Sequence, residues 1–260
     1  MGRPVSATAA ALILFALLCA ALPRCAQAQP PAWRTVRANR VVAHYPQSMP
    51  EVQIEALLTA CAKARESVEK WFGLEMRERL EMRVYPDTPS FVSTTGAPWW
   101  HSAVWTGGML HIQPPQVLAE RGALLTTLSH EYTHIALEQT VKQQLPLWFE
   151  EGLSGLISME FEALVKNKEQ EHVWRGTIKD LSVALTQKQK PARAQSAYIG
   201  AFLLLRDLES QFSRKTILAF LKDLDKDSVF EAKFELYFKA SPDNALKSLQ
   251  KKYPRTKKKS

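Results

Sequence analysis

Three polar residues in the stretch SHEYTHIALEQ have types and spacing that suit a metal site. His130 and His134 lie four residues apart, and Glu131 directly follows the first of them. Residues four apart are neighbours on one face of an α-helix, so both imidazoles can point at a common ion. Glu131 lies beside that face, where it is poorly placed as a third ligand but can reach a water molecule next to the ion. The spacing therefore predicts a metal site with a base beside it.

A third ligand is needed, because a catalytic zinc ion usually takes three protein ligands and leaves its fourth position open. The extended pattern H-E-x-x-H-x-x-G-x-x-H is excluded, since Leu137 and Thr140 stand where its Gly and third His should be. The stretch LPLWFEEGLSG is the better source, because Pro146 suits the first turn of a new helix. If that helix folds back on the first, it brings Glu150 or Glu151 opposite the two histidines. The alternative is a chance pairing of polar residues on one helix.

The motif resembles the gluzincins, and in particular the peptidase MA-like metallohydrolases, over about residues 103–157. HEYTH is followed, after a spacer, by WFEEGLSGLI, which is similar to the family's W-x-x-E-G helix. The resemblance implies that His130, His134 and Glu151 bind Zn²⁺ and that Glu131 is the general base. The spacer is shorter than in the familiar aminopeptidases of this clan, and Ser154 replaces the usual Ala, but neither departure removes a ligand.

The same resemblance implies a residue that stabilises the oxyanion and a strand that receives substrate. Tyr198, in QSAYIGAFLLLRDL, is the candidate for the oxyanion, although Gly200 is not at the family's position, and His172 is its rival. A Tyr with a purely structural hydroxyl is the alternative for Tyr198. The segment GGMLHI (107–112) is the expected substrate-binding edge strand, or else an ordinary hairpin strand.

The elements that must position these residues follow from hydrophobic periodicity. The pattern predicts strands at 33–45 and 79–86, a hairpin at 103–115, and helices at 51–72 and 123–139, whereas DTPSFVSTTGAPWW is typical of a loop. After the HExxH helix the chain is helical almost to its end. We therefore expect an α+β, zincin-like fold, with a small N-terminal mixed β-sheet lobe that includes the HExxH helix and a C-terminal helical lobe.

The two ends of the chain differ from the rest. A basic residue, an apolar run and an A-x-A cleavage site predict a signal peptide over 1–28, hence an exported protein, periplasmic or secreted. A retained anchor is the alternative. We expect lobes at 29–140 and 141–250, followed by a basic disordered tail at 251–260.

Charge and cysteine content limit the function classes. The chain has 34 basic and 26 acidic residues, but two basic residues lie in the leader and six in the tail, so the body is neutral. This argues against a nucleic-acid-binding protein, and the tail is a candidate for contact with anionic surfaces. Once the leader is removed, Cys61 alone remains, so no internal disulfide can form and a buried, inert thiol is expected.

The sequence therefore predicts an exported zinc metallopeptidase with a peptide or protein substrate, and no stable membrane insertion after leader removal. The alternatives are a zinc hydrolase of envelope amides, and a zinc-stabilised binding or chaperone-like module. His44 and His101 are expected to be surface or satisfied histidines, whereas His111 could line the cleft. The cluster of Trp99, Trp100 and Trp105 is read either as core packing or as a substrate platform.

Overall fold

The computed structural model describes residues 32–187 and 189–255. All of them except Ala32 belong to a compact unit that begins at Trp33. The expected signal peptide at 1–28 lies outside the described residues, as do residues 256–260 of the expected tail. No helix within the described ranges has the length and apolar character needed to cross a membrane.

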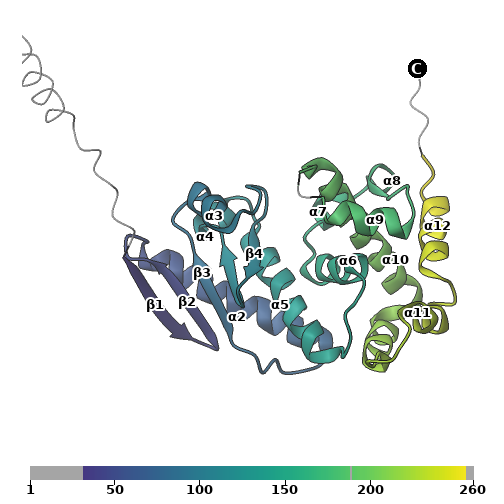
Figure 1. Cartoon of the computed structure of the whole chain (residues 1–260), viewed down its shortest axis with the longest axis horizontal. Helices are drawn as coiled ribbons and strands as arrows, with labels where there is room; N and C mark the ends of the chain where they lie inside the picture. Colours follow the sequence, from purple (N-terminus) through teal and green to yellow (C-terminus); the bar gives the residue numbers. More distant parts are fainter. Residues whose placement is uncertain (1–31, 188, 256–260) are drawn as a thin grey trace, which may run out of the picture. The chain divides into compact units, whose positions relative to one another are not determined.

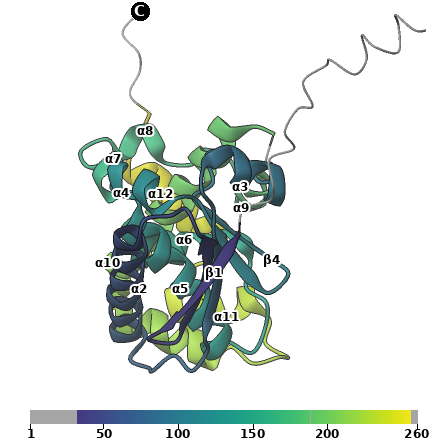
Figure 2. The same cartoon turned by 90° about the vertical axis from the view of Figure 1, so that its left-hand side faces the viewer.

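A five-stranded mixed sheet forms the N-terminal part of this unit (Figure 1). The strands, in spatial order, are β1 (Trp33–Ala38), β2 (Val41–Pro46), β3 (Leu80–Val84), β5 (Met109–Ile112) and β4 (Ala103–Thr106). The two pairs β2–β3 and β3–β5 are parallel, and the outer pairs β1–β2 and β4–β5 are antiparallel. Figure 2, turned toward the sheet, shows β1 in front and β4 at the far side of the sheet.

The single strand expected over 33–45 is wrong, because the chain reverses within it. Asn39 and Arg40 adopt positive φ values of 46° and 63°, which form a two-residue hairpin turn between β1 and β2. Two successive positive φ values are required in such turns, and Gly is the residue that usually signals them. Arg40 gives no such signal.

Helix α2 (Glu51–Phe72) connects β2 to the parallel strand β3, and its bounds match the prediction. Its apolar face is fully buried at Ile54, Leu57, Cys61, Ala64, Val68 and Phe72. The helix ends at Gly73, which has a φ of 65° and donates its N–H to the Glu69 carbonyl, as a left-handed C-cap does. In β3, Leu80, Met82 and Val84 are buried, as their alternation with charged residues predicted.

Helix α3 (Thr88–Thr95) replaces the loop expected from DTPSFVSTTGAPWW. The Asp87 side chain caps it by accepting a hydrogen bond from the N–H of Ser90 at 2.7 Å, and Pro89 lies in its first turn. Phe91 anchors it, with no exposed surface. The turn-forming residues were therefore start and stop signals of a short helix.

After β5 the described residues are mainly helical, as predicted. The helices are α4 (Pro115–Glu120), α5 (Leu124–Thr140), α6 (Leu147–Ser158), α7 (Glu162–Val165), α8 (Glu169–His172), α9 (Ile178–Leu185), α10 (Pro191–Asp223), α11 (Phe230–Phe238) and α12 (Pro242–Lys252). Ser213, with a φ of 72°, interrupts α10. The structure is thus a mixed α+β arrangement, with an N-terminal five-stranded sheet and a helical C-terminal part.

Helix α5 packs against α2 on one side and α6 on the other, and α6 in turn packs against α10 (Figure 1). Behind α6, Trp148 and Phe149 pack edge to face against Phe230 and Phe234 of α11. Trp148 and Phe149 are 2% and 0% exposed, as expected for residues that anchor the helix. This packing fixes α6 so that its other face, which carries Glu151, meets α5.

The C-terminal helix extends into the expected tail. Lys251 and Lys252 are helical, and the ammonium of Lys252 donates to the Asp207 carboxylate at 2.7 Å. The disordered tail expected from 251 is therefore wrong for these two residues. Leu246 and Leu249, each 1% exposed, bind α12 to the core and explain why the helix persists.

Candidate metal centre

Two turns of α5 present His130 and His134 on one face, as the four-residue spacing requires. Their ring centroids are 5.1 Å apart, and both side chains are mostly buried. Helix α5 itself is fixed from the opposite side, where Leu128 and Ala136 are completely buried. The two imidazoles are therefore carried by a rigid element.

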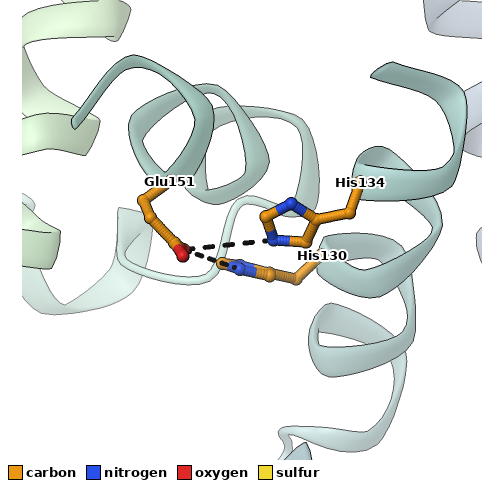
Figure 3. Close-up of side chains that lie close together, drawn as sticks. All are labelled: His130, His134 and Glu151. Carbon is orange, nitrogen blue, oxygen red and sulfur yellow. Dashed lines mark hydrogen bonds and ion pairs between the residues drawn. The ribbon is translucent and has the colours of Figure 1, made fainter. Parts of the chain in front are cut away.

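Glu151 reaches the same point from α6. Pro146 precedes the first turn of α6, and a short turn after α5 reverses the chain between them. The Glu151 Oε2 atom lies 3.2 Å from Nε2 of His130 and 4.0 Å from Nε2 of His134. Figure 3 shows the carboxylate pointing at the two rings, with one donor atom from each residue directed to a common space.

This geometry fits a small metal ion. One ligand atom from each of His130, His134 and Glu151 lies within 4.8 Å of the others. Ligands of tetrahedral zinc, about 2.0–2.1 Å from the ion, stand roughly 3.3 Å apart, and the distances of 3.2 and 4.0 Å from Glu151 to the two histidines are close to this value. The group could hold a metal, and two imidazoles with one carboxylate are a donor set that suits zinc.

A carboxylate lies behind each histidine. Nδ1 of His130 contacts Oε2 of Glu160 at 3.0 Å, and Nδ1 of His134 contacts Oε1 of Glu150 at 2.8 Å. Because an ionised carboxylate only accepts hydrogen bonds, each Nδ1 must carry a proton, which leaves Nε2 as the atom that faces Glu151. Histidines that bind metals are commonly oriented in this way.

The electrostatics of the group call for a cation at its centre. Burial opposes a charge on His130, but its hydrogen bonds to Glu151 and Glu160 outweigh burial and raise its pKa well above the usual value. Burial would likewise raise the pKa of Glu151, yet the hydrogen bond to His130 and the nearby His134 lower it. A proton or a metal ion between the imidazoles and the carboxylate therefore stabilises the arrangement.

Glu131 lies beside the group and not within it. Its side chain is 9% exposed, and burial raises its pKa, although His130 and His134 act in the opposite direction. The Trp105 side chain, on β4, also acts to lower the pKa of this carboxyl group. The predicted position of Glu131, on the shoulder of the histidine face, is what the structure contains.

A cavity of about 690 Å³ opens over these residues. His130, Glu131, His134 and Glu151 line it, together with residues from the segment 100–105, α6 and α10. Tyr198 also lines this cavity, whereas His172, its rival for the oxyanion role, is absent from the lining. Burial and the carboxylates of Glu151, Glu160 and Glu131 raise the pKa of Tyr198, so its hydroxyl stays protonated.

Several sequence expectations around the site need correction. The segment 107–112 is not an edge, because β5 is hydrogen-bonded to β3 on one side and to β4 on the other. Strand β4 is the edge, and it carries Trp105 into the cavity. β5 is an inner strand because one side pairs with β4 in the hairpin and the other side pairs in parallel with β3.

The other histidines were assigned with mixed success. His44 is a satisfied histidine that contacts Thr35 at 2.9 Å and Glu81 at 3.1 Å. His111 does not line the cavity, because its Nδ1 contacts the Tyr85 hydroxyl at 2.7 Å and its ring stacks on that residue. His101, expected to be a surface or satisfied histidine, lines the cavity.

Of the three tryptophans, Trp100 and Trp105 line the cavity, and Trp99 is 65% exposed, so this cluster is not core packing. Cys61 is buried as expected, and burial raises the pKa of its thiol to about 12. Sequence reasoning did not find Glu160, which follows a turn at Met159, or the contact of Glu150 with His134. Only the presence of carboxylates near the motif could have suggested them.

Comparisons with known proteins give partial likenesses. No family model matches the chain. It is 27% identical over 135 residues to the uncharacterised protein YhcO of Bacillus subtilis (strain 168), across 48% of this chain and 40% of that protein. The match therefore spans less than half the length of this relative.

Among solved structures, yeast LTA4 hydrolase in complex with bestatin is similar with a TM-score of 0.48 and 15% identity, over 85% of this chain and 36% of that one. The E323A mutant of the M1 zinc metallopeptidase from Deinococcus radiodurans has a TM-score of 0.48 and 15% identity, over 88% of this chain and 53% of that one. At these values the function of this chain has to be argued from its own residues.

Proposed function

We propose that this chain is a zinc-dependent hydrolase of gluzincin type that cleaves peptide bonds. The observation that carries the proposal is the convergence of His130, His134 and Glu151 from two helices, with Glu131 beside them at the wall of a cavity. His130, His134 and Glu151 would hold the ion. When bound, zinc supplies Lewis acidity, which acidifies a water molecule and polarises a substrate carbonyl.

Glu131 is the proposed general base. Its carboxylate takes a proton as water adds to the carbonyl carbon, and it later gives that proton to the amine nitrogen as the C–N bond breaks. Burial raises its pKa, which brings the carboxyl closer to neutral pH, where a group that must both accept and donate a proton works best. Trp105 lines the same cavity as Glu131.

Tyr198 is the proposed donor to the carbonyl oxygen on which negative charge develops. It lines the cavity with its hydroxyl protonated, and a preorganised donor at such a position stabilises the transition state more than the ground state. Replacement of Tyr198 by Phe should lower kcat by roughly 10²-fold, the cost of removing one such donor, with a small effect on KM.

A metal and activity assay on the full chain tests this function. Purified protein should contain close to one zinc per chain, cleave a mixed peptide library, and lose cleavage on treatment with a chelator. Glu131→Gln should retain zinc and lose cleavage, whereas Glu66→Gln, an exposed carboxylate on α2 outside the cavity, should behave as wild type.

The outcomes separate this proposal from its alternatives. Zinc without cleavage of peptides, but with cleavage of other amides, would favour a hydrolase of envelope amides. Zinc without any turnover in wild type and in Glu131→Gln would favour a binding or chaperone-like module. That module is disfavoured here because a structural zinc site needs no carboxylate in the position of Glu131 and no adjoining cavity.

We also propose that the protein is exported. The leader-like residues 1–28 support delivery to a periplasmic or secreted location, with Gln29 as the first residue of the mature chain. N-terminal sequencing of the protein recovered from the source cells tests this, and an intact Met1 would contradict it.

A further inference from the structure

The lining of the cavity is strongly acidic. Six carboxylates and one guanidinium line it, namely those of Glu78, Glu131, Glu138, Glu150, Glu151, Glu160 and Arg79. Six carboxylates and one guanidinium leave an excess of five negative charges. A divalent cation held by His130, His134 and Glu151 would neutralise only two of these five. The cavity therefore remains negative even when a metal is bound, and a cleft with walls of one charge concentrates ligands of the opposite charge.

This charge is local and does not reflect the composition. The whole chain has a formal net charge of +8, and its body, without leader and tail, is neutral. The carboxylates are gathered at the cavity against this background. Three of them are already engaged, since Glu150, Glu151 and Glu160 contact the two histidines.

Glu78 and Glu138 have no such role. Both are exposed, and within the described part of the chain no ion pair involves either of them, although Arg79 lines the same cavity. Glu138 lies one helical turn beyond His134, so its Cα is about 6 Å further along the α5 axis. The two carboxylates therefore extend the acidic lining past the metal group.

Helix stability does not explain the carboxylate of Glu138. It lies in the last turn of α5, where the helix end carries partial negative charge and a cation would be favoured, yet no basic residue occupies that turn. Residues 75–77, which precede β3, are held beside the end of α5. Gln139 accepts a hydrogen bond from the N–H of Arg77 at 3.1 Å and donates one to the Glu75 carbonyl at 3.0 Å. Glu78 is thereby held near the same helix end.

Aromatic side chains give a second, independent indication of what binds. Trp100 and Trp105 line the cavity, and Trp105 is 38% exposed although it is a large apolar side chain. The face of a tryptophan attracts ammonium and guanidinium groups. Carboxylates and tryptophan faces in one cavity are both complementary to organic cations.

We propose that the part of the cavity lined by Glu78 and Glu138 is a subsite for a cationic side chain, which the faces of Trp100 and Trp105 in the same cavity also attract, so that the substrates are peptides with Lys or Arg close to the cleaved bond. This inference rests on the proposed peptidase function, which supplies the bond that is cleaved. It adds the class of substrate, and it assigns the recognition to carboxylates that neither contact the metal group nor take part in the chemistry.

Matched peptides on the zinc-loaded full chain test the subsite. A set of fluorophore–quencher peptides, in a Gly/Ala/Ser/Leu background, carries Lys, Arg, Gln or Glu at one position that is moved along the peptide. At one such position kcat/KM should be roughly five- to tenfold higher for Lys and Arg than for Gln, and lower still for Glu. Added salt should reduce the difference, because exposed charges are screened.

Variants assign the preference to the two carboxylates. Glu138→Gln should reduce the Lys-to-Gln ratio at that position several-fold, Glu138→Asp should retain most of it, and Glu138→Lys should reverse it in favour of Glu. The double variant with Glu78→Gln and Glu138→Gln should have a lower Lys-to-Gln ratio than Glu138→Gln alone. Glu66→Gln, with the same change in net charge outside the cavity, should leave the ratio unchanged.

Binding without turnover separates this inference from the proposed function. Anisotropy of the same peptides, singly labelled, is measured on Glu131→Gln and on Glu131→Gln with Glu138→Lys. Cleavage with no preference for cations at any position overturns the subsite and leaves the peptidase standing. Preferential binding of Lys and Arg peptides, abolished by Glu138→Lys, without cleavage by wild type, supports the subsite and overturns the peptidase. Neither binding nor cleavage overturns both.

Discussion

The outer ring nitrogens of His130 and His134 each contact a carboxylate, and these contacts set how the rings are presented. Glu160 holds His130 and Glu150 holds His134, so both Nε2 atoms face Glu151. A carboxylate in this position also raises the basicity of the imidazole toward a metal. The affinity for zinc should therefore depend on two residues that do not touch the ion.

Loss of Glu160 should weaken zinc binding by roughly 10- to 100-fold, the effect that removal of such a partner typically has. Glu160→Gln retains an acceptor for the Nδ1 proton and loses only charge, so its loss should be smaller than that of Glu160→Ala. Competition with a chromophoric chelator measures the affinity. Equal affinities in wild type and Glu160→Ala would show that the contact does not orient His130.

The stability of the protein should respond to pH in opposite directions with and without metal. His130 has a raised pKa in the folded, metal-free chain, so its contribution to the free energy of unfolding is fully present below about pH 6.5. That contribution is lost as the pH rises through the folded-state pKa. Zinc, in contrast, requires neutral imidazoles and is bound more tightly as the pH rises.

The difference in Tm between zinc-loaded and chelator-treated protein should consequently be larger at pH 8 than at pH 6. Thermal unfolding followed by circular dichroism at a series of pH values measures it. Curves that run parallel across this range would contradict a zinc site built on these imidazoles.

At the scale of elements, the α6–α10 contact sets the position of Glu151. Gly152, the residue after Glu151, lies so close to α10 that an added Cβ would be 2.7 Å from the Ala201 carbonyl oxygen and 2.8 Å from Leu205 Cδ2. Because the first of these is backbone, the helices would have to separate. A glycine is thus needed for close packing directly beside the carboxylate that faces the histidines.

Gly152→Ala should lower the free energy of unfolding by about 1–3 kcal/mol, the usual cost of overpacking, and should also weaken zinc binding. Gly155→Ala is a matched control on the same helix, since its nearest contact would be a Phe161 side-chain carbon at 3.2 Å and should cost less. Chemical denaturation and zinc titration measure both effects. A Gly152→Ala variant with unchanged zinc affinity would show that Glu151 does not depend on this packing.

The elements differ in how far the sequence predicts them. The α2 helix, the β4–β5 hairpin and the α5–α6 reversal follow from periodicity and from single residues such as Gly73 and Pro146, whose backbone preferences are strong. The β1–β2 turn and α3 were missed, because Arg40 adopts a positive φ without being Gly and because Asp87 and Pro89 serve equally in a turn or at a helix start. The pairing of β5 with β3 depends on contacts distant in sequence, which local patterns do not contain.

The same limit applies to the candidate site. The types and spacing of His130, Glu131 and His134 were sufficient to predict that both imidazoles share one face of α5 with Glu131 beside it, since a helix fixes the geometry of residues four apart. The position of Glu160 depends on the left-handed turn at Met159, which has a φ of 58°. No residue near Met159 has a type that predicts such a turn. Its partnership with His130 was therefore beyond sequence reasoning.

At the scale of the whole unit, the candidate ligands come from two helices that belong to different parts of the fold. α5 packs on α2 in the N-terminal part, whereas α6 packs on α10 in the helical part. No internal disulfide can stabilise the described residues, whose single cysteine, Cys61, is buried and free. A bound ion would therefore act as the cross-link between the two parts.

Zinc should accordingly raise the thermal stability of the whole unit in one cooperative transition. An ion that binds only the folded state at about 100 times its Kd adds roughly 2.7 kcal/mol, which corresponds to a rise in Tm of about 5–10 °C for a domain of this size. Differential scanning calorimetry with zinc and with chelator measures the shift. His134→Ala should abolish it, whereas His44→Ala, which lies outside the cavity, should retain it. Two separate transitions, of which only one responds to zinc, would show that the ion stabilises one part and does not join them.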